Sequence, residues 1–180
     1  MKTLLLKNVN AVLPDREATG VSVVIAEGKI AAIDGGGSAA EVIDLAGAVL
    51  LPGFIDVHIH GSVGIDVMDA TPEQLCEISD FLASQGVAGW VPTFVPASDD
   101  NYASAVDAIA KAAQVPAGAR VLGVHYEGPF VNSAQCGALH TEYFKTYSGP
   151  ADLDGLPVPA GLVRMTTLAP EIDGGVDLVR

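Results

Sequence analysis

The sequence predicts an α/β fold in which a small antiparallel β unit precedes a parallel arrangement of strands and helices. In residues 1–50, short strand patterns follow one another, separated by tight turns. From residue 51 onward, buried strand patterns alternate with amphipathic helix patterns, which is typical of a parallel βα fold. A chain of 180 residues is long enough for one domain with a sizeable core.

The first part of the chain is expected to form five short strands. Residues 3–13 are an apolar strand pattern that is interrupted near Asn8. Further strand patterns follow at residues 21–25, 30–33, 42–45 and 48–50. The glycine-rich segment 35–38 is expected to be a loop. A phosphate-binding cradle is the alternative, but no helix with Lys-Ser or Lys-Thr follows it.

The second part, residues 51–180, is expected to contain four buried strands and two long helices. The strand patterns lie at residues 51–60, 87–95, 121–130 and 162–168. The first helix is predicted to have Thr71 as its N-cap and to end at Gly86. The second helix is predicted to be capped by Asp99 or Asp100.

The strand at residues 51–60 ends in two histidines, His58 and His60. Alternate side chains of a strand share a face, so both imidazoles are expected to point the same way as Asp56. The carboxyl ends of strands are where parallel barrels place their chemistry, and neutral histidine is a common metal ligand. The alternative is a pair of half-buried, hydrogen-bonded histidines. The opposite face is expected to pack under helices and carries Ile55, Val57 and Ile59.

The third strand pattern brings a carboxylate to the same edge of the predicted sheet. Glu127 lies at the end of this strand and shares a face with His125. If the strands are parallel, Glu127 meets His58 and His60, and the three groups can bind zinc or a similar divalent metal. A structural role would require a basic partner for Glu127, and the chain has only nine Lys and Arg residues. Asp56 and His125 are expected to orient the ligands from behind.

Composition argues against two classes of partner. The net charge of −13 argues against nucleic acid and against anionic membrane surfaces, both of which favour a basic face. Cys76 and Cys136 match no zinc-finger spacing, and their scarcity fits a reducing compartment. No signal peptide and no apolar run of about 18 residues are visible. A soluble, cytoplasmic protein is therefore expected.

Several segments carry a resemblance to a known family. Residues 52–61, PGFIDVHIHG, resemble the first-strand metal motif of the amidohydrolase superfamily. Residues 123–130, GVHYEGPF, are more specific and resemble the N-acetylglucosamine-6-phosphate deacetylases within it. Residues 92–93 and 167–171 fit the same family, and the match extends to Arg180.

The resemblance implies an α/β fold of the TIM type. Residues 1–50 would be a portion of an antiparallel β-sandwich, and residues 51–180 the first part of a metal-dependent (β/α)₈ barrel. A whole barrel needs about 250 residues, so this chain is expected to be a fragment. The family's catalytic aspartate is expected beyond Arg180, and the full-length enzyme is expected to be a homodimer.

The resemblance also implies roles for individual residues. Glu127 would bind the metal, together with His58 and His60 as in family members that have both histidines, with one or two ions and most simply zinc. The family's Gly-Ala-His contacts the sugar from the long loop after the third strand. Here the loop reads Gly-Ala-Leu-His, so the expected substrate contacts are Ala138 with either Leu139 or His140.

The reaction implied is deacetylation of N-acetylglucosamine 6-phosphate to glucosamine 6-phosphate and acetate. One alternative is another amidohydrolase that acts on a cyclic amide. Those enzymes more often carry a lysine on the fourth strand, and residues 162–168 contain none. The other alternative is a non-catalytic half-barrel that binds metal or assembles with a second chain. Its open sheet edge would favour pairing with another chain.

Overall fold

We describe the protein from a computed structural model of residues 3–35 and 39–180. The chain divides into two compact units, Met1–Pro52 and Gly53–Arg180. The glycine-rich loop predicted at residues 35–38, with its phosphate-binding alternative, falls almost entirely outside the described residues.

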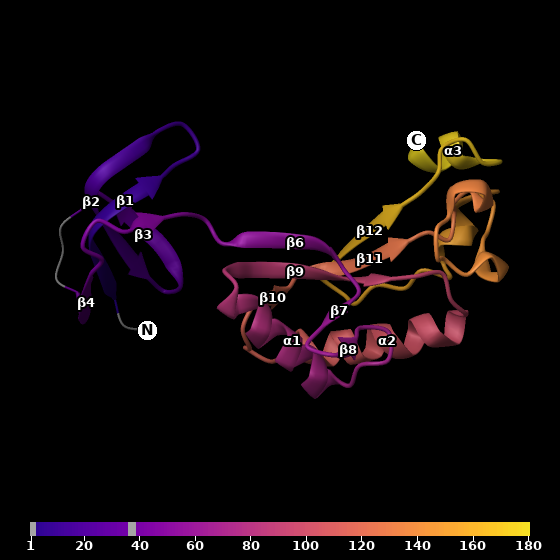
Figure 1. Ribbon diagram of the computed structural model, residues 1–180, viewed down its shortest axis with the longest axis horizontal. Coiled ribbons are helices and arrows are strands. Elements are labelled where there is room, and N and C mark those ends of the chain that lie inside the picture. The colour runs from indigo at the N-terminus through magenta and orange to yellow at the C-terminus, as the bar shows by residue number, and fades with distance from the viewer. Residues whose placement is uncertain (1–2, 36–38) are drawn as a thin grey trace. The chain divides into compact units, whose positions relative to one another are not determined.

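The first unit is a five-stranded mixed sheet in the order β3-β2-β1-β4, with β5 also paired to β1 (Figure 1). Its strands are β1 (Leu4–Val12), β2 (Glu17–Ala26), β3 (Lys29–Ile33), β4 (Glu41–Asp44) and β5 (Val49–Leu50). β2 and β3 are antiparallel to their partners, but β4 and β5 run parallel to β1. The prediction of a purely antiparallel unit is therefore wrong. After β3, the strands β4 and β5 pair with β1 on the side away from β2, and both run in the same direction as β1.

The break predicted near Asn8 is confirmed. Asn8 has a φ of +55°, and the pairing of β1 with β2 shifts register between Leu6 and Val9. The side-chain amide of Asn8 donates to both carboxylate oxygens of Asp44 at 2.8 Å. Asparagine tolerates this left-handed conformation better than most residues, so the bulge forms at this position. The small core of the unit lies on both sides of the bulge and contains Leu6, Val9, Ala11 and Val23.

The second unit contains a parallel sheet, as predicted. Its strands are β6 (Phe54–Ile59), β9 (Val87–Phe94), β10 (Arg120–Val121), β11 (Gly123–Glu127) and β12 (Val163–Thr167). β6 pairs with β9 on one side, β10 and β11 pair with β9 on the other, and β12 pairs with β11. The strands thus follow one another in chain order, and their carboxyl ends lie at one edge. A short hairpin, β7 (Gly61–Ser62) and β8 (Ile65–Asp66), follows β6.

Helices α1 (Pro72–Ser84) and α2 (Asp99–Ala112) lie on the same side of this sheet (Figure 1). The predicted N-cap of α1 is confirmed, because the Thr71 hydroxyl accepts the backbone N–H of Gln74. The N-cap of α2 is Ser98, so the prediction of Asp99 or Asp100 is wrong. Both aspartates occupy the first turn instead, where the helix dipole also favours a negative charge.

The long connection between β11 and β12 contains three short 3₁₀ helices, Ser133–Gln135, Thr141–Tyr143 and Pro150–Leu153. A final short helix, α3 (Gly175–Val179), follows β12. Figure 1 shows this connection and α3 at the carboxyl-end side of β11 and β12. No helix in the described residues combines the length and hydropathy needed to cross a membrane.

The core of the second unit lies between the sheet and the two long helices. Its largest fully buried side chains include Trp90, Phe94, Tyr102, Tyr126 and Phe130. The rings of Phe94, Tyr102 and Tyr126 contact one another, with centroids 5.0–6.0 Å apart. Burial raises the pKa of Tyr102 to about 12, so this phenol stays neutral in the core.

One expectation for β6 is not met. Ile55 and Val57 were expected to pack under helices, but their side chains are 61% and 44% exposed. β6 is the edge strand of the described sheet, and α1 packs on β9 rather than on β6. Only Ile59 of the predicted apolar face packs against the core.

Candidate metal centre

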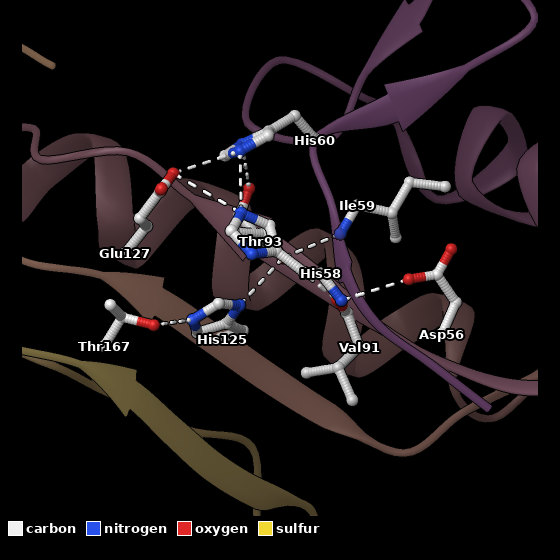
Figure 2. Close-up of polar contacts among 9 residues, drawn as sticks. All are labelled: Asp56, His58, Ile59, His60, Val91, Thr93, His125, Glu127 and Thr167. Atoms are coloured by element: carbon white, nitrogen blue, oxygen red, sulfur yellow. Dashed lines mark hydrogen bonds and ion pairs between the residues drawn. The ribbon is translucent and has the colours of Figure 1, made fainter. Parts of the chain in front are cut away.

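The structure brings together the three residues predicted as metal ligands. Figure 2 shows His58, His60 and Glu127 directed toward one another from the carboxyl ends of β6 and β11. Nε2 of His60 lies 3.2 Å from Nε2 of His58 and 3.1 Å from Oε2 of Glu127. Nε2 of His58 lies 3.5 Å from the same carboxylate oxygen. The histidine side chains are nearly half exposed, so the site is open to solvent.

These distances fit one bound ion. In a tetrahedral zinc site, metal–ligand bonds of about 2.0–2.2 Å place neighbouring ligand atoms about 3.3–3.6 Å apart. The three separations of 3.1–3.5 Å are close to that range. Carboxylate oxygens and the unprotonated nitrogens of neutral histidines are all hydrogen-bond acceptors, and acceptors this close together need a cation or a proton between them. The two histidine nitrogens and the carboxylate oxygen therefore fit the coordination of a divalent metal.

The ring of His60 is oriented by a backbone group. Its Nδ1 lies 3.2 Å from the carbonyl oxygen of Thr93. A carbonyl can only accept, so Nδ1 must carry the hydrogen. In neutral His60 the lone pair is therefore on Nε2, the atom that faces His58 and Glu127. A backbone carbonyl on the far nitrogen is the usual support of a metal-binding histidine.

β6 is irregular near its carboxyl end, at His58 and just before His60. Between Asp56 and Ile59, β6 has one residue more than its partner strand β9. The carboxylate of Asp56 accepts the backbone N–H of His58 at 3.0 Å and, in Figure 2, points away from Glu127. The expectation that Asp56 shares a face with both histidines is therefore wrong, because the extra residue interrupts the period-two alternation. Asp56 contacts the backbone of His58 and not its ring.

His125 lies fully buried behind the site. Its Nδ1 is 3.1 Å from the Thr93 hydroxyl, and its Nε2 is 2.8 Å from the Thr167 hydroxyl. Its ring packs edge-on against that of His58, with centroids 4.8 Å apart. Burial lowers the pKa of His125, and the neighbouring His58 lowers it further. The neutral ring thus supports His58 by packing and contacts neither Glu127 nor His60 by a hydrogen bond.

The long loop after β11 places the predicted substrate residues differently. Leu139 lines an open cavity of about 370 Å³ together with Glu127, Asn132 and Thr167. Ala138 and His140 are not among the residues that line it. His140 is largely exposed and its Nδ1 lies 3.8 Å from Glu142. Leu139 therefore shares this cavity with Glu127, a predicted metal ligand.

Two threonines in the site were not assigned a role from the sequence. Thr93 contacts His60 through its carbonyl and His125 through its hydroxyl, and Thr167 contacts His125 and lines the cavity. The sequence contains one signal, the Pro92-Thr93 pair inside an otherwise apolar strand. A proline within a buried strand indicates an interrupted hydrogen-bond ladder.

The residue after His60 is constrained by its surroundings. Gly61 has a φ of +152°, and a Cβ at this position would lie 2.0 Å from the carbonyl oxygen of Ile65. We expect Gly61→Ala to lower the free energy of unfolding by about 1–3 kcal/mol, since it forces strain on the backbone. Urea unfolding measures this change. Gly149→Ala is the control, because a Cβ there meets open space. Equal stability of the two variants would contradict the constraint.

Comparison with known proteins identifies relatives of the whole chain. The model of the amidohydrolase family matches residues 41–126. An N-acetylgalactosamine-6-phosphate deacetylase of Escherichia coli O157:H7 is 37% identical over 158 residues, which are 87% of this chain and 41% of that protein. An N-acetylglucosamine-6-phosphate deacetylase of Bacillus subtilis (strain 168) is 34% identical over 191 residues, covering 99% of this chain and 47% of that protein. The chain spans less than half the length of these relatives.

Solved structures of deacetylases have the same fold over almost the whole of this chain. The N-acetylglucosamine-6-phosphate deacetylase of Thermotoga maritima superposes with a TM-score of 0.77 at 32% identity, covering 98% of this chain and 45% of that one. A variant of the Mycobacterium smegmatis enzyme in complex with N-acetyl-D-glucosamine-6-phosphate has a TM-score of 0.80 over 99% of this chain and 46% of that one. At 24% identity it supports the fold alone. The chain is a homologue of the N-terminal part of the N-acetylglucosamine-6-phosphate deacetylases, and its residues 41–126 match the amidohydrolase family.

Proposed function

We propose that the full-length protein containing this chain is a metal-dependent deacetylase of N-acetylglucosamine 6-phosphate. The observation that carries the proposal is the convergence of His58, His60 and Glu127 within 3.1–3.5 Å of one another. It occurs on a chain homologous to such deacetylases. The three residues would hold one divalent metal, and zinc suits two imidazoles and a carboxylate.

The reaction adds water across the acetamide C–N bond. The hydroxyl goes to the acetyl carbon and a proton to the nitrogen, which releases acetate and glucosamine 6-phosphate. When bound, a divalent metal would lower the pKa of a water molecule and polarise the amide carbonyl. Glu127 contributes the negative charge among the three ligands, and the Thr93 carbonyl keeps the Nε2 lone pair of His60 free. A general base, an aspartate in the family this chain resembles, would come from the rest of the full-length protein.

The cavity beside Glu127 is the proposed place for the sugar. Its volume of about 370 Å³ is within the range of small-molecule sites. Asn132 and Glu171 line it, and the two are hydrogen-bonded at 3.1 Å. Amide and carboxylate groups of this kind can bind sugar hydroxyls. A cavity of about 410 Å³ near the start of β10 contains none of the predicted site residues, so we assign it no role in this reaction.

We also propose the larger fold. The strands β6, β9, β11 and β12 would be the first four of a (β/α)₈ barrel, with the first unit as part of a β-sandwich. Their parallel pairing in chain order supports this, as does a site at their carboxyl ends. Val163 and Met165 on β12 are 63% and 36% exposed, which fits a strand that the rest of the barrel would cover.

The test is acetate release by the purified full-length protein. We expect protein stripped with a chelator to release no acetate from N-acetylglucosamine 6-phosphate and to recover activity when zinc is added. Absence of turnover with zinc, manganese and cobalt alike would refute the deacetylase. If metal bound without turnover, the non-catalytic metal-binding module would be the better description.

A second substrate has a specific observation in its favour. The Escherichia coli O157:H7 relative, at 37% identity, is an N-acetylgalactosamine-6-phosphate deacetylase. The two sugar phosphates differ in the configuration of one hydroxyl, so the same acetate assay with both substrates decides between them by their kcat/KM values. Hydrolysis of a cyclic amide has less support, since the relatives above are deacetylases and β12 carries no lysine.

A further inference from the structure

Thr93, on β9, contacts three separate parts of the candidate metal centre. Its hydroxyl accepts the backbone N–H of Ile59, the residue between the two histidines, at 2.9 Å. Its carbonyl oxygen lies 3.2 Å from Nδ1 of His60, and its hydroxyl lies 3.1 Å from Nδ1 of His125. Thr93 is itself fully buried. Figure 2 shows it between these groups.

The hydroxyl of Thr93 takes the place of a backbone hydrogen-bond acceptor between β6 and β9. In the irregular stretch of β6, Ile59 stands opposite Pro92, which has no N–H to donate. The N–H of His58 is taken by the side chain of Asp56, and the next N–H, that of Ile59, by the side chain of Thr93. Two consecutive backbone donors beside the ligands are therefore held by side chains.

The hydrogen-bonding capacity of this hydroxyl is fully used. Its hydrogen is donated to the carbonyl oxygen of Val91 at 3.3 Å. Its two lone pairs then accept from the N–H of Ile59 and from Nδ1 of His125. Valine has the shape of threonine but can make none of these bonds, whereas serine can make all of them.

We infer that Thr93 is the positioning residue of the candidate metal centre. Its hydroxyl holds the irregular β6 backbone between His58 and His60, and its carbonyl selects the His60 tautomer that presents Nε2 to the metal. Together they aim both ligand nitrogens at Glu127. The inference rests on the proposed metal-binding function. The effect of Thr93 on the β6 backbone is nevertheless measurable without metal.

The test uses the full-length protein and its Thr93→Val and Thr93→Ser variants. Zinc affinity is measured by competition with a chelator. Removing a group that orients a metal ligand typically costs 10–100-fold in affinity, so we expect Thr93→Val to bind zinc about 10–100-fold more weakly. Thr93→Ser is expected to restore binding to within about threefold of the wild type, because the hydroxyl is kept.

Thr71→Val is the matched control. It removes the N-cap hydroxyl of α1 and lowers stability without touching the site, so its zinc affinity is expected to equal that of the wild type. In the metal-free proteins, hydrogen exchange of the Ile59 amide is expected to be faster in Thr93→Val than in Thr71→Val. If Thr93 contributed only to overall stability, Ile59 amide exchange would be accelerated to the same extent in Thr93→Val and in Thr71→Val.

The outcomes separate the inference from the proposed function. If the wild type binds no metal, the proposed function fails, and Ile59 exchange alone decides whether Thr93 holds β6. If the wild type binds zinc and Thr93→Val binds it equally well, the inference is overturned while the metal site stands. Unchanged Ile59 exchange in Thr93→Val would also overturn it.

Discussion

Glu127→Gln is expected to lower the zinc affinity of the full-length protein by more than about 100-fold, beyond the 10–100-fold typical of supporting residues. The substitution would keep the shape of the side chain but remove the only negative charge among the three converging groups. A neutral amide oxygen is a weaker ligand for a divalent cation than a carboxylate. Metal content after dialysis and competition with a chelator measure the loss, and acetate release should fall with it.

Glu77→Gln is the control for this variant. Glu77 is exposed on α1 and takes no part in the site, so its replacement makes the same chemical change elsewhere. Fluorescence of Trp90, the only tryptophan, reports whether the core is intact in both variants. If Glu127→Gln bound zinc as tightly as Glu77→Gln, the carboxylate of Glu127 would not be a ligand.

Trp90→Ala is expected to lower the free energy of unfolding by about 3–5 kcal/mol, the usual cost of truncating a buried tryptophan. Trp90 is fully buried on β9, in the core between the sheet and the helices. Its indole N–H donates to the hydroxyl of Ser79 on α1 at 3.0 Å, and this hydroxyl is buried too. The variant would leave both a cavity and an unpaired polar group. Urea unfolding followed by far-UV circular dichroism measures the loss without needing the indole.

Phe81→Ala gives the matched aromatic control on α1. Phe81 is 39% exposed, so its truncation is expected to cost about 1 kcal/mol or less. The two losses differ because only Trp90 fills enclosed space. A loss for Trp90→Ala no larger than that for Phe81→Ala would show that the core does not depend on the indole.

The sequence by itself determined the features that have local signals. The cap of α1 was predictable because Thr71 and Pro72 stand next to each other before an apolar helical pattern. The meeting of His58, His60 and Glu127 was predictable from two simple facts: each residue ends a buried strand, and parallel strands end at one edge. The alternation of strands and helices in the second unit is likewise present in the hydrophobic pattern.

The tertiary structure decided what depends on pairing between distant segments. Strand patterns carry no direction, so the parallel pairing of β4 and β5 with β1 was not foreseen. The extra residue in β6 turned Asp56 out of the predicted face. Thr93 and Ile59 lie 34 positions apart in the chain. Their contact depends on the register of β6 against β9, which backbone hydrogen bonds and packing set only in the folded protein.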